Sequence, residues 1–306
     1  ESFFNSTILT AYSHYDTSVM RKRVGPLDYG DRVQLTDQKG KLHSFTLTQD
    51  GTFHTHRGWI LHKDLVGCPE GSTITTSGGA THLVFRPLYE DYVLGMKRGA
   101  TIIYPKDAAT IVTLGDIFPG ARVIEAGAGS GAMSIAILER IGPTGSLTSY
   151  ERRTEFAENA RSNVSSYFGE IPQNWSLIEG NFPEVCDFNQ KMDRIVLDML
   201  APWECVDGVG ELLNPGGVLI CYVATTTQLS QTVERIREHT GFSEPTSFET
   251  MYRTWHVEGL AVRPDHRMVG HTGFISIARK LAPGVVAPAR RRRPAKGAYG
   301  LSVNEE

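Results

Sequence analysis

A glycine-rich stretch in the middle of the 306-residue chain has the residue types and spacing of a ligand-binding turn. It follows the apolar run ARVIEA (121–126), and glycine then alternates with small residues. Glycine adopts backbone angles that other residues avoid and lets a ligand approach the main chain closely. We therefore expect a cofactor at this turn, with contacts from Glu125, Gly127, Ala128, Gly129, Ser130 and Gly131.

Two further acidic residues stand where apolar runs end. Glu151 closes GSLTSYE (145–151), a position from which a carboxylate can accept hydrogen bonds from ribose hydroxyl groups. Asp198 closes RIVLD and is soon followed by Pro202 and Trp203. Asp198 is therefore either a turn or capping residue, or a carboxylate that faces the group receiving a transferred methyl.

The glycine spacing bears on which cofactor binds. The pattern is Glu-x-Gly-x-Gly-x-Gly, whereas a nicotinamide site has Gly-x-Gly-x-x-Gly, in which Ala132 would also be tolerated as the last residue. Glu125 ahead of the glycines suits a ligand with a cationic amino group, which S-adenosylmethionine has and nicotinamide dinucleotides lack. These residues favour an S-adenosylmethionine-dependent methyltransferase. A nicotinamide-dependent oxidoreductase and a glycine turn without a ligand remain the alternatives.

Strand-like and helix-like segments alternate from about Pro119, and they predict the elements that hold these residues. Apolar side chains recur at helical spacing in 132–141 and from 154 onwards, and a later helix is expected to be capped by Gly241. The expected strands are 121–126, 145–151, 175–180, 194–199, 218–224, 255–262 and 273–278. This alternation predicts an α/β fold, a doubly wound domain with a mostly parallel sheet.

The expected division of the chain follows from where these patterns begin and end. Short strand-like runs separated by turn signals predict a small β-rich amino-terminal domain at 28–90. The α/β domain is expected at 91–285. Residues 1–27 are expected to be a flexible extension, and the basic segment 286–306 a disordered tail.

Composition limits the class of protein. Apolar residues make up 40% of the chain and charged residues 21%, and no apolar run is long enough to span a membrane. Four cysteines without a Cys-x-x-Cys pair favour a cytoplasmic protein. The net charge of −3 requires any nucleic-acid-binding surface to be local. His54 and His56 have no third ligand at suitable spacing, so no metal site is expected.

Five motifs taken together resemble a known family. They are YPKDAA (104–109), EAGAGSGA (125–132), SYERR (149–153), LDMLAPW (197–203) and GHTGF (270–274). In this order and spacing they are similar to the tRNA (adenine-N1)-methyltransferases that act on adenosine 58, particularly the homotetrameric bacterial and archaeal type and its actinobacterial form.

The resemblance spans about residues 29–288. It implies a Rossmann-like methyltransferase domain with a β-rich amino-terminal domain, S-adenosylmethionine as the cofactor and tRNA as the partner. The implied methyl acceptor is N1 of adenosine 58 in the T-loop. The same glycine turn also occurs in methyltransferases that act on another RNA site or on protein carboxylates, and these remain the alternatives.

The resemblance assigns cofactor contacts to particular residues. Residues 127–130 would surround the methionine part of the cofactor, and Glu151 would hold the ribose with Arg153 close by. Asn181 and Phe182 stand where the family contacts the adenine, although relatives often have an acidic residue at the first of these positions.

The resemblance also assigns residues to the reaction. Asp198 corresponds to the family's catalytic aspartate, and Tyr104 to a tyrosine that lines the pocket of the target base. Gly273 stands where alanine is commoner, and we expect this difference to be structural only.

Basic side chains are expected to contact tRNA phosphates, because pulling base 58 out of its stack costs free energy that binding must offset. The candidates are Arg57 and the basic runs at 21–23 and 290–293. The alternative for each run is a solvated, flexible segment.

Overall fold

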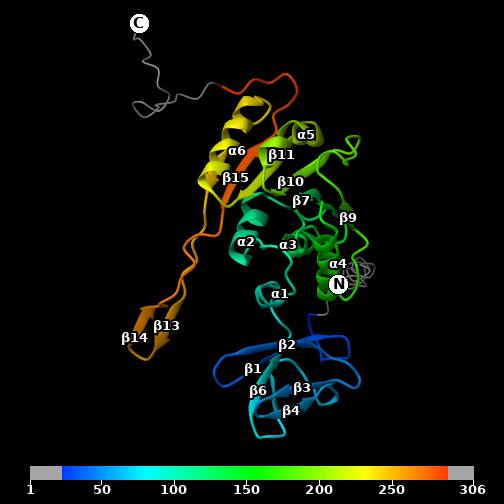
Figure 1. The fold of residues 1–306 in the computed structure, drawn as a ribbon, viewed down its shortest axis with the longest axis vertical. Coiled ribbons are helices and arrows are strands. Elements are labelled where there is room, and N and C mark those ends of the chain that lie inside the picture. Colours follow the sequence, from blue (N-terminus) through cyan, green and yellow to red (C-terminus); the bar gives the residue numbers. More distant parts are fainter. Residues whose placement is uncertain (1–22, 289–306) are drawn as a thin grey trace, which may run out of the picture.

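The computed structural model describes residues 23–288, and its amino-terminal part is a small antiparallel sheet (Figure 1). The strand order is β2-β1-β6-β5, with β3 and β4 forming a separate hairpin. The elements are β1 (Arg32–Thr36), β2 (Leu42–Thr46), β3 (Thr52–Thr55), β4 (Gly58–Leu61), the 3-10 helix η2 (His62–Asp64), β5 (Ser72–Thr75) and β6 (Thr81–Phe85).

This small sheet has a core of its own. Buried and exposed residues alternate along β6, as expected for a strand with one solvated face. Leu27 is also buried in this core, and the Arg86 guanidinium donates hydrogen bonds to the carbonyl oxygens of Gly25 and Pro26. The anchored part of the chain therefore begins before residue 28.

The second sheet has seven strands in the order β12-β15-β11-β10-β7-β8-β9. Its five parallel strands are β7 (Arg122–Ala126), β8 (Ser146–Glu151), β9 (Trp175–Glu179), β10 (Met192–Asp198) and β11 (Leu213–Val223). The antiparallel strands β15 (Phe274–Arg279) and β12 (Thr246–Phe248) complete it. The predicted mostly parallel α/β sheet is confirmed.

Helices cover both faces of this sheet. One apolar core contains side chains from α1 (Tyr89–Gly95), α2 (Pro105–Leu114), α3 (Ala132–Ile141) and α4 (Thr154–Phe168). The other contains side chains from α5 (Val206–Leu212) and α6 (Thr226–Glu238). The connections therefore change face between the neighbouring strands β7 and β10, and open α/β sheets bind ligands at the carboxyl ends of the strands beside such a switch point.

The sequence prediction of single elements was wrong in two places. Helix α6 ends at Glu238 with His239 as its cap, so Gly241 does not cap it. A Cβ atom at Gly241 would lie 2.7 Å from the His239 ring, so a side chain there would make that ring shift. The segment 255–262, expected as one strand, is a hairpin of β13 (Trp255–Glu258) and β14 (Ala261–Pro264) that turns at Gly259.

This hairpin lies at the end of an arm, residues 250–272, that extends away from the α/β domain (Figure 1). The arm leaves the sheet after β12 and returns to it at β15. Among residues 23–288, no helix is both long and apolar enough to cross a membrane.

Candidate active site

The glycine turn lies at the switch point, between the end of β7 and the start of α3. Gly127, Gly129 and Gly131 all have positive φ angles, of 93°, 54° and 83°, in the region that favours glycine. The turn is fixed by its main chain, since the N–H groups of Gly127 and Ala128 both donate to the carbonyl oxygen of Tyr150. The backbone is therefore set before any ligand arrives.

Two of these glycines are also required by close packing. A Cβ atom on Gly127 would lie 1.8 Å from the carbonyl oxygen of Asp198, so the turn passes directly against the end of β10. A Cβ atom on Gly131 would lie 3.2 Å from the Cα atom of Ala160 in α4. Gly129 is half-buried and has more room.

Glu151 lies at the end of β8, where it faces the turn. Its carboxylate accepts hydrogen bonds from the N–H of Gly129 at 2.9 Å and from the N–H of Arg153 at 3.1 Å. A carboxylate has about four acceptor sites, so two hydroxyl groups can still bind. The Arg153 side chain is exposed and stacks on Phe156 near this carboxylate. The ribose contact of Glu151, with Arg153 close by, stays a prediction.

Glu125 is placed differently from a simple ligand contact, because its side chain is completely buried. One carboxyl oxygen accepts hydrogen bonds from Ser134 and Ser149, both at 2.6 Å, and the other has no protein partner in the described chain. Burial raises the pKa of Glu125 to about 7. A direct contact between Glu125 and a cofactor therefore stays a prediction.

Asp198 is half-buried at the end of β10, opposite Tyr222 of β11 in the parallel register. Burial raises its pKa to about 8, and the nearby carboxylates of Glu125 and Glu151 add to this effect. Three carboxyl groups thus surround the turn, and a cationic ligand would be favoured among them.

Tyr104 is half-buried and caps the amino end of α2. Its carbonyl oxygen accepts the N–H groups of Asp107 and Ala108, both at 2.9 Å, which fixes its backbone. The Asp107 carboxylate accepts a hydrogen bond from the Tyr222 hydroxyl, and Tyr222 is the residue paired with Asp198. The structure therefore brings the first turn of α2 beside the end of β10.

The two predicted adenine contacts follow β9. Asn181 is exposed, and its amide nitrogen donates to Glu184 at 2.8 Å, which leaves its carbonyl oxygen free to accept. The Phe182 ring is buried and packs against Tyr150. Asn181 can therefore meet a ligand with its side chain, whereas the ring of Phe182 lies in the protein core.

Sequence reasoning missed the segment that closes over the turn. The Ser130 hydroxyl is buried and accepts hydrogen bonds from the N–H groups of Gly99 and Ala100. Ala100 also lies beside Gly129, at 3.6 Å from the position of a Cβ atom there. Gly99 preceding the YPKDAA motif was the available signal.

The basic candidates for tRNA contact lie apart from the turn. Arg57 is exposed in the turn between β3 and β4, close to the exposed His54 and His56. Arg23 forms an ion pair with Glu139 of α3, while the remainder of run 21–23 and the run 290–293 lie outside the described residues. Within residues 23–288, no group of three or more metal-binding side chains occurs.

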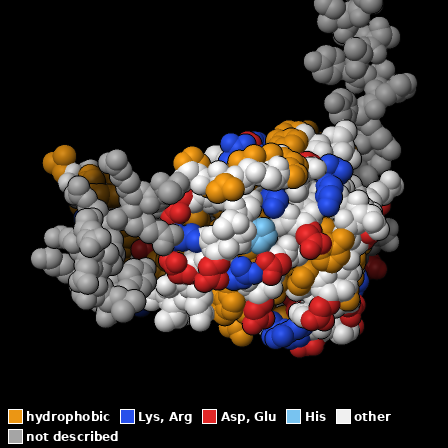
Figure 2. Space-filling view, turned by 90° about the horizontal axis from the view of Figure 1, so that it is seen from above, with side chains coloured by type: hydrophobic (Ala, Val, Ile, Leu, Met, Phe, Trp, Pro, Cys, Tyr) orange, Lys and Arg blue, Asp and Glu red, His pale blue; other side chains and the backbone are white. Residues whose placement is uncertain are grey.

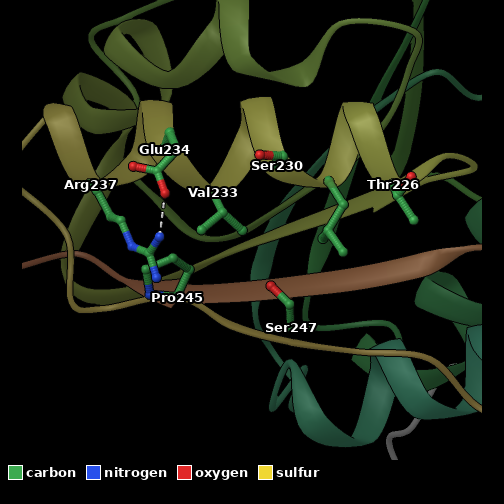
Figure 3. Close-up of a pocket in the computed structure, with 8 residues that line it drawn as sticks. Thr226, Ser230, Val233, Glu234, Arg237, Pro245 and Ser247 are labelled. Atoms are coloured by element: carbon green, nitrogen blue, oxygen red, sulfur yellow. Dashed lines mark hydrogen bonds and ion pairs between the residues drawn. The ribbon is translucent and has the colours of Figure 1, made fainter. Parts of the chain in front are cut away.

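Charge is mixed on the surface seen in Figure 2, where basic and acidic side chains are interspersed. A shallow pocket of about 330 Å³ lies along α6 beside β12 (Figure 3). It contains none of the predicted site residues and lacks the glycine turn. We therefore locate the site by the carboxyl ends of the strands rather than by this pocket.

The residues at the switch point suit S-adenosylmethionine. The turn presents main chain without side chains, Glu151 retains acceptor sites, and a buried Glu125 oxygen lacks a partner among residues 23–288. The carboxyl groups match a ligand that carries positive charge. The fold, with an antiparallel strand inserted beside β11, is that of the S-adenosylmethionine-dependent methyltransferases.

Comparison with known proteins places the chain within that class. Residues 81–262 match the family described as tRNA methyltransferase complex GCD14 subunit, and residues 25–74 match the TrmI-like N-terminal family. The chain belongs to the tRNA (adenine-N1)-methyltransferase family. The expected resemblance to the actinobacterial form of this family stays a prediction.

Two curated relatives cover most of the chain. The tRNA (adenine(58)-N(1))-methyltransferase TrmI of Thermus thermophilus is 33% identical, over 80% of this chain and 95% of its own. The tRNA (adenine(57)-N(1)/adenine(58)-N(1))-methyltransferase TrmI of Methanocaldococcus jannaschii is 31% identical, over 80% of this chain and 93% of its own.

Two solved structures share the fold. An S-adenosylmethionine-dependent O-methyltransferase of Thermotoga maritima has a TM-score of 0.78 and 31% identity, over 87% of this chain and 96% of its own. The tRNA (m1A58) methyltransferase TrmI of Aquifex aeolicus has a TM-score of 0.72 and 24% identity, over 84% of this chain and 100% of its own.

Proposed function

We propose that the protein transfers a methyl group from S-adenosylmethionine to N1 of adenosine 58 in the T-loop of tRNA. The observation that carries this proposal is the position of Asp198. Its main-chain carbonyl oxygen lies against the glycine turn at Gly127. Asp198 is also paired with Tyr222, which donates a hydrogen bond to Asp107 in the first turn of α2, just after Tyr104. Family membership supports the substrate, since the relatives named above are tRNA methyltransferases.

The cofactor would be held by residues around the turn. The main chain of 127–131 and the carboxylate of Glu151 would hold the methionine part and the ribose, with Asn181 accepting from the adenine amino group. When bound, S-adenosylmethionine supplies an electrophilic methyl group on a sulfonium. The protein's part is to align the acceptor nitrogen in line with that methyl group.

Asp198 would act on the target base. Methylation at N1 leaves positive charge on the adenine, and an ionised carboxylate that accepts a hydrogen bond from the N6 amino group stabilises that charge. The same carboxylate can take the proton that the product must lose. Because the pKa of Asp198 is raised to about 8 in the protein alone, a cation bound beside it is needed to favour the ionised form at neutral pH. Tyr104 would position the base.

Backbone contacts would hold the tRNA while base 58 is extruded, an event that costs a few kcal/mol. Arg57 lies exposed on the small β-rich domain and is the described candidate for a phosphate contact. Binding should therefore weaken as salt concentration rises.

A homotetramer is part of this proposal. The arm exposes large apolar side chains, among them Trp255 at 56%, Val257 at 67% and Leu260 at 103%. A second copy of the chain is the occupant that would cover them, because exposed apolar groups of this kind are typical of permanent interfaces. Replacing Trp255 and Leu260 by serine should yield smaller species in light scattering, whereas an unchanged mass would refute this role of the arm.

A cytoplasmic location also belongs to the proposal. It follows from the tRNA substrate, and the four free cysteines are compatible with a reducing compartment.

The test is methylation of an unmodified tRNA transcript, followed by a reverse-transcription stop at position 58. Wild-type protein should produce the stop, and Asp198→Ala should reduce the rate by at least about 100-fold, as for loss of a residue that stabilises transition-state charge. S-adenosylhomocysteine should still bind the variant. Near-normal turnover of Asp198→Ala would refute the mechanism. A wild-type protein that leaves position 58 unmodified would refute the function.

A further inference from the structure

The two ends of the arm meet at an exposed histidine. The Nδ1 atom of His271 lies 2.8 Å from a carboxylate oxygen of Glu249, and its Nε2 atom lies 2.9 Å from the carbonyl oxygen of Ala224. Glu249 directly precedes the arm, His271 is one residue from the end of the arm, and Ala224 directly follows β11. The ring therefore joins the departing chain and the returning chain to the end of the strand beside β10.

Both partners of this ring can only accept hydrogen bonds. An ionised carboxylate and a main-chain carbonyl have no proton to donate, whereas a neutral imidazole has one N–H group and one acceptor nitrogen. A neutral ring could therefore satisfy Glu249 or Ala224, but not both. The imidazolium has two N–H groups and makes both hydrogen bonds at these distances.

The elements packed around the ring bring charged groups to it. The hydrogen bonds to Ala224 and Glu249 raise the pKa of His271 above its ordinary value, and the charge of Lys106 in α2 opposes this effect. The Phe274 ring of β15 also packs against His271, with 4.6 Å between ring centroids, and carries no charge. Because the net direction is upward, His271 retains its second proton above about pH 6.5, where an ordinary histidine loses it.

Lys106 supports the other side of the arm base. Its ammonium group donates to the carbonyl oxygen of Thr250 at 2.8 Å and contacts the Thr272 hydroxyl at 2.6 Å. Thr272 in turn donates to the buried Asp107 carboxylate at 2.6 Å. Burial alone would raise the pKa of Asp107, but the hydrogen bonds from Lys106, Thr250 and Thr272 lower it below its usual value. Asp107 therefore stays ionised at neutral pH, and this half of the attachment does not depend on a histidine.

We propose that His271 is a proton-dependent clasp at the base of the arm. With two N–H groups the ring ties Glu249 and the returning chain to the end of β11, and with one it loses one of its two hydrogen bonds, so that the base of the arm loosens. The stability that the clasp contributes is fully present below about pH 6.5 and is lost as pH rises through the raised pKa of His271. Since the arm bears the exposed Trp255 and Leu260, the same proton controls how firmly that apolar surface is held.

Nuclear magnetic resonance of the ring tests the protonation directly. In protein isotopically labelled only in histidine, the signals of His271 are those that are absent from His271→Gln. Its titration should be centred above about pH 6.5, and both ring nitrogens should carry protons below that centre. In Glu249→Gln the pKa should fall, because a neutral amide replaces the carboxylate. A titration centred at or below about pH 6.5, or an unchanged pKa in Glu249→Gln, would overturn the inference.

Amide hydrogen exchange tests the release of the arm. After correction for the intrinsic effect of pH, exchange in peptides from 249–254 and 266–274 should rise at least about threefold between about pH 6 and about pH 9, as expected when one modest hydrogen bond is lost. In His271→Gln, exchange should already be fast at about pH 6 and should change less than about twofold over this range.

His256 provides the matched control, because it is a half-exposed histidine of the same arm with one carboxylate partner, Glu258, at 3.5 Å. His256→Gln should keep the pH dependence of the wild type. Loss of that dependence in His256→Gln, or its persistence in His271→Gln, would place the titrating group elsewhere and overturn the clasp.

The failure of this inference differs from the failure of the proposed function, because neither measurement uses tRNA or cofactor. Wild-type protein that methylates position 58 while exchange at the arm base is independent of pH would keep the function and remove the clasp. Wild-type protein that leaves position 58 unmodified while His271 titrates and the arm loosens as described would do the reverse.

Discussion

Gly127 lies so close to Asp198 that it has no room for a side chain, since a Cβ atom on Gly127 would lie 1.8 Å from the carbonyl oxygen of Asp198. The turn and the end of β10 are thus held together by main-chain packing. The backbones of the turn and of β10 meet at the switch point, so the main chain of Asp198 cannot move far without moving the turn.

Gly127→Ala should weaken cofactor binding by at least about tenfold, or about 1.4 kcal/mol. The substitution places a Cβ atom against backbone and requires alanine to adopt a φ of 93°. Gly95→Ala is the control, because its Cβ atom would meet nothing within 4 Å. Titration with S-adenosylhomocysteine measures both, and equal affinities would contradict the packing argument.

Asp198→Asn should stabilise the ligand-free protein at alkaline pH. The folded-state pKa of Asp198 is raised to about 8 by burial, whereas an unfolded aspartate titrates near about 4. The wild type therefore loses stability as pH rises from about 4 to about 8, and asparagine avoids this loss. The melting temperature of the variant should exceed that of wild type at pH 8 and approach it near pH 4.

Asp193, also on β10, provides a control in which stability changes with pH in the opposite direction. Burial alone would raise its pKa, but hydrogen bonds from Arg122 and Asn214 lower it below the usual value. Its contribution to stability is present above the unfolded pKa and lost as pH falls, so Asp193→Asn should be less stable than wild type at neutral pH. Equal pH profiles for the two variants would refute both assignments.

S-adenosylmethionine should release more protons on binding than S-adenosylhomocysteine does. The carboxyl groups of Asp198 and Glu125 have pKa values raised to about 8 and about 7, and a positive ligand lowers both. Titration calorimetry at pH 7 in two buffers of different ionisation enthalpy measures the difference. Equal proton release would show that the sulfonium binds away from these carboxyl groups.

Glu184→Ala should reduce discrimination between adenine and hypoxanthine in the cofactor. Glu184 accepts from the amide nitrogen of Asn181 at 2.8 Å, which presents the amide oxygen to an amino group. Without Glu184 the amide can turn and donate instead, so the affinity ratio of S-adenosylhomocysteine to S-inosylhomocysteine should fall roughly threefold, within the range of one modest hydrogen bond. Glu184→Gln keeps an acceptor and should preserve the ratio.

The turn was predictable from sequence because all of its determinants are local. The apolar strand, the alternating glycines and the amphipathic helix follow each other within 121–141, and the structure has β7, the turn and α3 in that order. Met133, Ile137 and Ile141, spaced for a helix, are all buried. The α/β fold followed from the repetition of such units.

The hydrogen bond between Tyr222 and Asp107 was not predictable, because the two residues are far apart in the chain. Tyr222 and Asp107 are separated by 115 residues, and no periodicity or spacing rule relates them. Helix α2 did have a signal that was overlooked, since Pro105 is its first residue and proline is favoured there. The hairpin of the arm was read as a strand because Gly259 alone does not distinguish a turn from a bulge.

The carboxyl groups around the glycine turn have a consequence for catalytic turnover. S-adenosylmethionine carries one more positive charge than its demethylated product. The carboxylates of Glu125 and Glu151 act electrostatically on Asp198, and they would favour the ligand with the additional positive charge. The spent molecule loses this attraction as soon as the methyl group leaves. We therefore expect the demethylated product to bind less tightly than S-adenosylmethionine at these carboxyl groups, which would reduce product inhibition.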